Sequence, residues 1–281
     1  MLQIGLRAHD YGTNLSPEKL AEALVAFRPA SVQLALAKSL DCAPRPGGLN
    51  PGYARRIRKT LEAKGICIAV LGCYINPVHP DPAAREAQLY RFEEHLRFAR
   101  DFGCPMVATE TGSCNGDCSF HPDTGKQETF DLLCRSLERL LAVAEKCGSI
   151  VAIEAVAGQH TVCSIPKMEQ TLCRLASPAL KVIYDPVNLI PENGLEEPQE
   201  DFFAQAFAAF GNDIAAIHAK DFCMEGGRKK GDLPAGTGEL DYKALLKIVG
   251  LQKPGIDILL ENSSPATCRQ AMAFLQNAAG F

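Results

Sequence analysis

The stretch Ile150-Val151-Ala152-Ile153-Glu154 is a short apolar run that ends in an acid. Runs of this length, rich in aliphatic residues, are typical of strands that are buried on both faces. The same pattern recurs three times further along the chain, and a polar side chain closes each run. These runs are Val182-Ile183-Tyr184-Asp185, Ala215-Ala216-Ile217-His218 and Ile258-Leu259-Leu260-Glu261. The second half of the chain therefore predicts four buried strands, each with a polar group at its carboxyl end.

Four further apolar segments precede these in the first half of the chain. The eight predicted strands cover residues 3–7, 31–36, 67–71, 106–109, 150–154, 181–184, 215–218 and 257–260. Amphipathic segments separate them, and they carry helix signals such as Ser16-Pro17-Glu18 and Asp81-Pro82 at their starts. Strands that alternate with helices pair in parallel, because each connection crosses back over the sheet.

The spacing of the segments favours a closed barrel. Successive segments begin about 36 residues apart, which suits an eightfold barrel of roughly 250 residues. An open doubly wound sheet normally carries a G-x-G-x-x-G turn after an early strand, and the sequence has none. We therefore predict an α/β fold with one (β/α)8 TIM barrel domain over residues 1–281. Residues 43–48 and 224–238 then form long loops after strands two and seven.

Composition and charge exclude several classes of protein. The chain has 281 residues, of which 47% are hydrophobic and 22% charged, a balance that excludes whole-chain disorder. The formal net charge is -4, whereas a nucleic-acid binder usually gathers positive charge. The apolar N-terminus meets His9-Asp10 too early for a signal peptide, and no apolar stretch reaches the ~18 residues of a membrane helix. We expect a soluble cytoplasmic protein with a small-molecule partner.

The twelve cysteines are spread over the chain, and several lie inside apolar runs. Without a secretory signal they are expected to be reduced thiols. The set Cys114-x3-Cys118-x2-His121 has residue types that bind zinc, but a structural zinc site takes four ligands at tighter spacing. This segment is therefore interpreted as a polar loop.

The carboxyl ends of the strands of a barrel meet at one mouth, whatever their distance in sequence. Four consecutive predicted strands end in groups that ligate metals: Glu154, Asp185, His218 and Glu261. Taken singly, each acid has an alternative role as a loop cap or an ion-pair partner. Three unpaired carboxylates in a partly dry mouth are costly together, however, and a divalent cation neutralises most of that charge. Oxygen-rich ligation with one imidazole suits Mn, Mg or Co better than Zn, although Zn is an alternative.

These residues resemble the xylose isomerase-like TIM barrels, which include ketose 3-epimerases, hydroxypyruvate isomerase, inosose dehydratase and endonuclease IV. The resemblance covers nearly the whole chain. It is carried by Ile153-Glu154, Tyr184-Asp185-Pro186-Val187-Asn188, His218-Ala219-Lys220-Asp221, Ala235-Gly236-Thr237-Gly238-Glu239-Leu240-Asp241-Tyr242 and Leu260-Glu261. It implies that Glu154, Asp185, His218 and Glu261 hold one divalent ion, that Glu154 and Glu261 are the catalytic base and acid, and that homo-oligomers occur.

The chain departs from the ketose 3-epimerases at three substrate positions. His160 stands where those enzymes often have an acid, Asn188 where they have a His, and Met224 where they have an Arg that Arg228 is a candidate to replace. Endonuclease IV members share His218-x-x-Asp221 but use several more histidines to assemble three zinc ions. With six histidines in total, and Asn188 where one of those ligands would stand, the sequence argues against a trinuclear site. The full set of predicted substrate contacts is His9, Tyr74, Asn76, Glu110, His160, Asn188, Lys220 and Arg228.

Two positions near the predicted site are left open by the sequence. Gln33 lies within strand two, where alternation decides whether it points into the barrel or toward the helices. Asp221 is a candidate to orient His218 through the imidazole ring.

The leading functional hypothesis is a metal-dependent sugar isomerase or epimerase that transfers a proton next to a carbonyl, through an enediolate. Returning the proton to the other face of the same carbon gives epimerisation, and returning it to the neighbouring carbon gives isomerisation. An inosose-type dehydratase and a non-catalytic barrel that binds a sugar or a metal are the alternatives.

Overall fold

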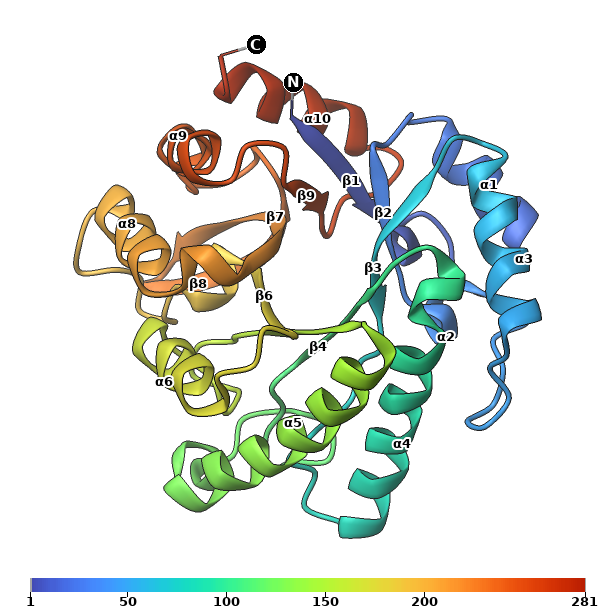
Figure 1. Cartoon of the computed structure of the whole chain (residues 1–281). Coiled ribbons are helices and arrows are strands. Elements are labelled where there is room, and N and C mark those ends of the chain that lie inside the picture. Colours follow the sequence, from blue (N-terminus) through green and yellow to red (C-terminus); the bar gives the residue numbers. More distant parts are fainter. Residues whose placement is uncertain (1, 281) are drawn as a thin grey trace.

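Eight parallel strands close into a ring in the computed structural model, which describes residues 2–280 (Figure 1). The order around the ring is β6-β5-β4-β3-β2-β1-β9-β7, and β6 also pairs with β7, so no edge is left open. The prediction of a single (β/α)8 barrel is confirmed. The strands are β1 (Gln3–Arg7), β2 (Ser31–Leu34), β3 (Cys67–Gly72), β4 (Met106–Glu110), β5 (Ile150–Glu154), β6 (Leu180–Tyr184), β7 (Ile214–Glu225) and β9 (Asp257–Leu260).

Helices surround the ring (Figure 1). The longer ones are α1 (Pro17–Val25), α3 (Pro51–Glu62), α4 (Pro82–Phe98), α5 (Gln127–Cys147), α6 (Ile165–Leu175), α8 (Gln199–Phe210), α9 (Tyr242–Gln252) and α10 (Cys268–Ala278). The shorter ones are α2 (Leu36–Ser39), α7 (Pro186–Leu189), η1 (Ala8–Asp10), η2 (Ala99–Phe102), η3 (Pro122–Gly125) and η4 (Gly211–Asp213).

Local sequence explains where several helices begin and end. The Ser16 hydroxyl accepts from the Lys19 amide at the start of α1, and Pro17 occupies its first turn. Helix α5 ends at Gly148, whose φ of 62° places it in the left-handed region that favours glycine. None of the helices within residues 2–280 combines the length and apolar character needed to cross a membrane.

The strands are almost wholly buried and supply much of the core. Leu6, Val32, Val70, Ile153 and Leu260 have no exposed surface. Because the sheet is covered on both faces, its strands consist of nearly continuous apolar runs, and the polar residues concentrate at their ends. The ring therefore acts as a rigid frame for those end residues.

Two sequence predictions need correction. Leu36 begins α2 instead of ending the second strand, so β2 is shorter than predicted. Residues 224–238 are not an irregular loop, because β7 continues to Glu225 and turns back as the antiparallel strand β8 (Arg228–Pro234). The Asp221 carboxylate accepts from the amides of Gly236 and Leu240, which ties the returning segment to the barrel.

Candidate metal centre

Four side chains from consecutive strands of the ring meet at its carboxyl-terminal rim. Glu154 ends β5, Asp185 follows β6, His218 lies in β7 and Glu261 follows β9. All four are buried, and one ligand atom from each lies within 4.8 Å of all the others. Ligands on opposite sides of a divalent cation at about 2.1–2.4 Å are about 4.2–4.8 Å apart, so the spacing fits one ion. We call these four residues the metal cluster.

Three atoms of the metal cluster are buried polar groups without a hydrogen-bond partner of acceptable geometry. They are Oδ2 of Asp185, Nδ1 of His218 and Oε2 of Glu261. Charged groups nevertheless surround them: Nδ1 of His218 lies 2.9 Å from Oε2 of Glu261 and 3.2 Å from Oε2 of Glu154, and Nζ of Lys220 lies 3.1 Å from Oδ2 of Asp185. Carboxylate oxygens and an imidazole nitrogen that converge on one point in this way fit a divalent cation.

In Asp185 and Glu154, the carboxylate oxygen that does not face the centre accepts a hydrogen bond from Asn188. Oδ1 of Asp185 accepts from the Asn188 backbone amide at 3.0 Å, as the cap of α7. Oε1 of Glu154 accepts from Nδ2 of Asn188 at 2.6 Å. Asn188 thus contacts two members of the metal cluster and leaves one oxygen of each free to face the centre.

The imidazole of His218 is held from the opposite side of the ring. Its Nε2 lies 2.6 Å from Oε1 of Gln33, and Nε2 of Gln33 donates to the Tyr74 hydroxyl at 2.9 Å. An amide oxygen only accepts hydrogen bonds, so Nε2 of His218 carries a proton and Nδ1 is the nitrogen that can bind a metal once its own proton is lost. Gln33 therefore points into the barrel, and it takes the orienting position for which Asp221 was the candidate.

Two cations contact the remaining oxygen of Glu261. The Arg7 guanidinium pairs with Oε1 of Glu261 and with Asp10, and it also donates to Oδ1 of Asn262 at 2.5 Å. Nζ of Lys220 lies 3.4 Å from the same Glu261 oxygen and 3.1 Å from Oδ2 of Asp185. These cations offset part of the negative charge of the acids.

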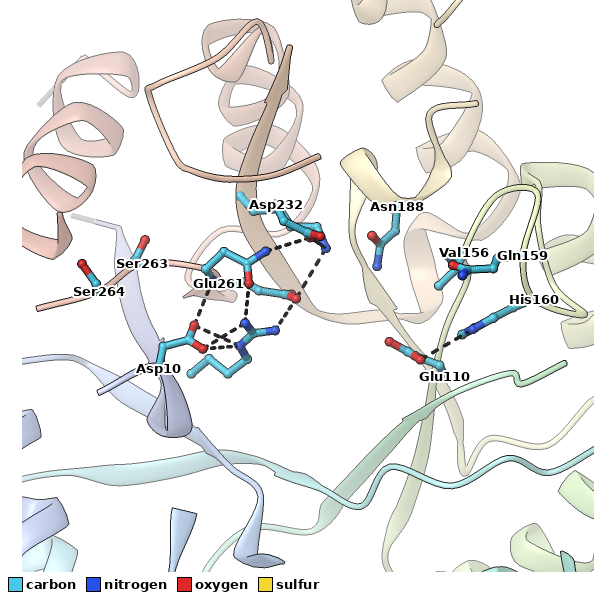
Figure 2. A pocket seen from close by; sticks show the side chains of 13 residues that line it. Asp10, Glu110, Val156, Gln159, His160, Asn188, Asp232, Glu261, Ser263 and Ser264 are labelled. Carbon is cyan, nitrogen blue, oxygen red and sulfur yellow. Dashed lines mark hydrogen bonds and ion pairs between the residues drawn. The ribbon is translucent and has the colours of Figure 1, made fainter. Parts of the chain in front are cut away.

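A cavity of about 590 Å³ opens beside the metal cluster. Glu261 belongs to both, and Lys220, which contacts Glu261 and Asp185, also lines the cavity. In Figure 2, Asp10, Glu261 and Ser263 lie on one side of it, and Glu110 and His160 face them from the other. The volume is that of a small-molecule site, and its lining is mostly polar. A polyhydroxylated ligand suits such a wall better than an apolar one.

The sequence profile of the xylose isomerase-like TIM barrel family matches residues 30–278. The chain belongs to this family. No curated protein matches the sequence.

Solved structures agree with the assignment. The Escherichia coli 3-keto-D-glucoside 4-epimerase has a TM-score of 0.74 at 14% identity, over 99% of this chain and 100% of that one. D-psicose 3-epimerase, solved in the presence of D-fructose, has a TM-score of 0.73 at 13% identity over 100% of both chains. A family member from Mycobacterium smegmatis in complex with magnesium has a TM-score of 0.71 at 15% identity, over 99% and 96% of the two chains. At these identities the likeness shows the shared fold.

In this member of the family, the charges of the metal cluster perturb one another. Burial acts to lower the pKa of His218, but Glu154 and Glu261 outweigh it and hold the pKa well above its usual value. Burial acts to raise the pKa of Glu261, yet His218 and Lys220 hold it well below its usual value. Burial raises the pKa of Asp185 to about 6, although Lys220 opposes the shift.

Most of the predicted substrate contacts lie at or near the cavity. Glu110, His160, Asn188 and Lys220 line it, with Nε2 of His160 3.8 Å from Oε2 of Glu110. Burial raises the pKa of Glu110 and lowers that of His160, so both shifts favour the neutral forms.

His9 and Tyr74 lie behind this wall. Their rings pack edge to face with centroids 6.0 Å apart. Burial, aided by the neighbouring Arg7, lowers the pKa of His9 to about 3, so its imidazole is neutral. Both residues support the site through packing and through the hydrogen bond of Tyr74 with Gln33.

The structure does not bring the two other predicted contacts to the cavity. The Asn76 amide donates to the backbone oxygens of Ser113 and Asn115, both at 2.8 Å, and so holds a loop. The Arg228 side chain is 77% exposed and pairs with Glu192, because the β7–β8 turn carries it outward. Arg228 therefore does not take the place expected for it at Met224.

The cysteine-rich segment forms no metal site within residues 2–280, where the metal cluster is the one group that meets the spacing. The Cys114 thiol contacts the Thr129 hydroxyl, and Nδ1 of His121 accepts from the Asp123 amide. These side chains thus have hydrogen-bond partners within their own segment.

Proposed function

We propose that this chain is a divalent-metal-dependent sugar isomerase or epimerase, with Glu154, Asp185, His218 and Glu261 as the metal ligands. The supporting observation is the convergence of four buried ligand atoms, one from each residue and all within 4.8 Å of one another, beside a polar cavity. The donor set of three carboxylates and one imidazole suits Mn, Mg or Co. Similar folds are those of a D-psicose 3-epimerase and an L-ribulose 3-epimerase.

The metal cluster would hold the divalent cation, which would supply polarisation of a neighbouring carbonyl and stabilisation of the negative charge on the deprotonated substrate. Glu154 and Glu261 are the proton-transfer residues of the proposal. Their strands, β5 and β9, are the two outer ones of the four that carry the metal cluster, so the two carboxylates approach from different sides. One removes the proton and the other returns it.

The neighbouring residues hold these carboxylates for the reaction. Asn188 fixes Glu154 through its Oε1, while Arg7 and Lys220 fix Glu261 through its Oε1. Glu110, His160 and Asn188 contribute hydrogen-bonding groups to the cavity wall and are the proposed partners of sugar hydroxyls. His9 and Tyr74 support them, whereas Asn76 and Arg228 lie outside this set.

Hydrogen exchange at carbon tests the proposal. The purified chain, loaded with Mn²⁺, is incubated in D₂O with D-fructose, D-psicose or L-ribulose, and deuterium beside the carbonyl is followed by NMR. We expect incorporation with at least one ketose and a loss of about 100-fold or more in Glu154→Gln and Glu261→Gln. The exposed Glu138→Gln is the matched control. Loss of water from the substrate would indicate the dehydratase, and binding without exchange would indicate the non-catalytic barrel.

A further inference from the structure

A second cavity of about 670 Å³ adjoins the one beside the metal cluster. The two share the wall residues Val156, Gln159, Asn188 and Asp232. Figure 2 shows the first three of these on the side of the first cavity away from Asp10 and Ser263. Each cavity alone lies within the range of roughly 300–1,000 Å³ that takes a small-molecule ligand. A ligand of one sugar unit at the metal cluster therefore leaves the second cavity empty.

An exposed aromatic ring lines the second cavity. Phe120 is 65% exposed, although a lone ring of this size is usually buried in a soluble protein. Hydrogen bonds within the loop hold its backbone. Nδ2 of Asn115 donates to the Phe120 backbone oxygen at 2.7 Å, and the Ser113 hydroxyl donates to the Ser119 backbone oxygen at 2.6 Å. The ring is thus presented at the rim by a loop with its own hydrogen bonds.

The rest of the second cavity is apolar on one part of its wall and polar on another. Val156, Ala157 and Val187 supply apolar surface, and Gln159, Asn188 and Asp232 supply hydrogen-bonding groups. A sugar ring has this dual character, since its C–H groups pack against the negative face of an aromatic ring while its hydroxyls bond to polar side chains.

The charges around the second cavity disfavour an anion. Its acids are Glu192 and Asp232, and its one cation in the described part of the chain is Lys229. Nζ of Lys229 already donates to the backbone oxygens of Val187 and Ile190, at 2.6 and 2.5 Å. Phosphate or carboxylate on the second unit would therefore face two acids and a single lysine that already donates to two backbone oxygens.

We infer that the second cavity binds a neutral second sugar ring, so that the substrate is a ketose that carries a glycosyl unit away from its reacting end. The inference rests on the proposed function, because it places the reacting ketose at the metal cluster. The ring of Phe120 stacks on the glycosyl unit, and the shared residues Gln159 and Asn188 lie at the junction of the two units.

Two ketoses that are identical at the reacting carbons test this inference. D-fructose is the short probe, and isomaltulose, which carries a glucosyl unit on O6 of fructose, is the long one. With the Mn²⁺-loaded full chain in D₂O, we expect kcat/KM for deuterium incorporation to be at least about tenfold higher for isomaltulose, chiefly through KM. Equal values, or a preference for D-fructose, would overturn the inference.

Substitutions of Phe120 test whether the second cavity is the source of the expected preference for isomaltulose over D-fructose. Phe120→Ala is expected to lower the ratio of the two kcat/KM values by about 3- to 10-fold, and Phe120→Tyr to retain it. Leu251→Ala, at a residue 77% exposed on α9, is the control and leaves the ratio unchanged. An unchanged ratio in Phe120→Ala would contradict the assignment.

Calorimetric titration separates this inference from the proposed function. If neither ketose exchanges deuterium, the proposed function fails, and the dissociation constants of the two probes then decide the inference alone. Tighter binding of isomaltulose that is weakened by Phe120→Ala supports the second site, and equal binding of both probes rejects it.

Discussion

The two halves of the barrel mouth contribute differently to the site. The strands from β5 to β9 bring the four side chains of the metal cluster, and each offers an atom to the centre. The strands from β1 to β4 bring groups that contact the metal cluster from outside: Arg7 pairs with Glu261, and Gln33 bonds to His218. In the proposed function the first set supplies the ligands of the ion, and the second set, together with Asn188 and Lys220, determines how the ligand atoms point.

The two sets also differ in how many residue types could serve at each position. A ligand needs a lone pair at one position, so few residue types serve there. An orienting residue needs only an acceptor or a donor that reaches its partner, and it acts on the metal indirectly. We therefore expect substitutions in the ligand half to have larger effects on metal binding than those in the orienting half.

The largest effect is expected from Asp185→Asn. An asparagine retains the oxygen that caps α7 but replaces Oδ2, which lies 3.1 Å from Nζ of Lys220, by an amide nitrogen, so the helix cap is kept while the ligand is lost. We expect Mn²⁺ affinity to fall roughly 100- to 1,000-fold, measured by titration calorimetry on the metal-free chain. Asp241→Asn makes the same change at the cap of α9, away from the metal cluster, and should bind Mn²⁺ normally. Equal affinities in the two variants would remove Asp185 from the ligand set.

A smaller effect is expected in the orienting half from Gln33→Leu. Leucine removes the acceptor of His218 and the donor to Tyr74, so the imidazole loses its fixed orientation. We expect Mn²⁺ affinity to fall about 10- to 100-fold, with Gln33→Glu recovering most of it because it keeps an acceptor. Gln88→Leu, which removes a hydrogen bond to the Asn76 amide instead, should lower stability without changing Mn²⁺ affinity. If both leucine variants bind the ion equally, the bond to His218 has no orienting role.

The difference between the halves also explains which features of the fold and of the site could be predicted from the sequence. Glu154, Asp185, His218 and Glu261 each end or follow an apolar run, and a closed barrel brings all such ends to one rim. The strand pattern therefore predicted both the fold and the gathering of these four side chains. Their positions depend on topology, which hydrophobic periodicity records well.

The orienting residues leave no comparable signal. Gln33 lies inside a strand whose four residues are all buried, so alternation of polar and apolar residues does not reveal its direction. Arg7 contacts residues more than 250 positions away, and one sequence holds no record of that pairing. The substrate contact predicted for Arg228 is not formed for a related reason. Its segment is a hairpin and not a loop, and the hairpin directs the Arg228 side chain to solvent. Contacts between side chains depend on register and turn geometry, which composition and spacing do not determine.

The last expected effect is that of pH, and it also distinguishes the metal cluster from the orienting residues. The orienting Gln33 does not titrate, whereas Asp185 has a pKa raised to about 6 by burial, and Glu154 and Glu261 raise the pKa of His218 against the effect of its burial. Both raised values favour the protonated forms in the metal-free fold, so their stabilisation is present at low pH and is lost as pH rises through the folded values. A metal must displace these protons, and its affinity should thus rise about tenfold per proton for each pH unit in this range. Melting temperatures with and without Mn²⁺ should accordingly diverge between pH 5.5 and 7.5. A constant difference across that range would mean that neither proton competes with the ion, which would contradict the assignment of Asp185 and His218 as ligands.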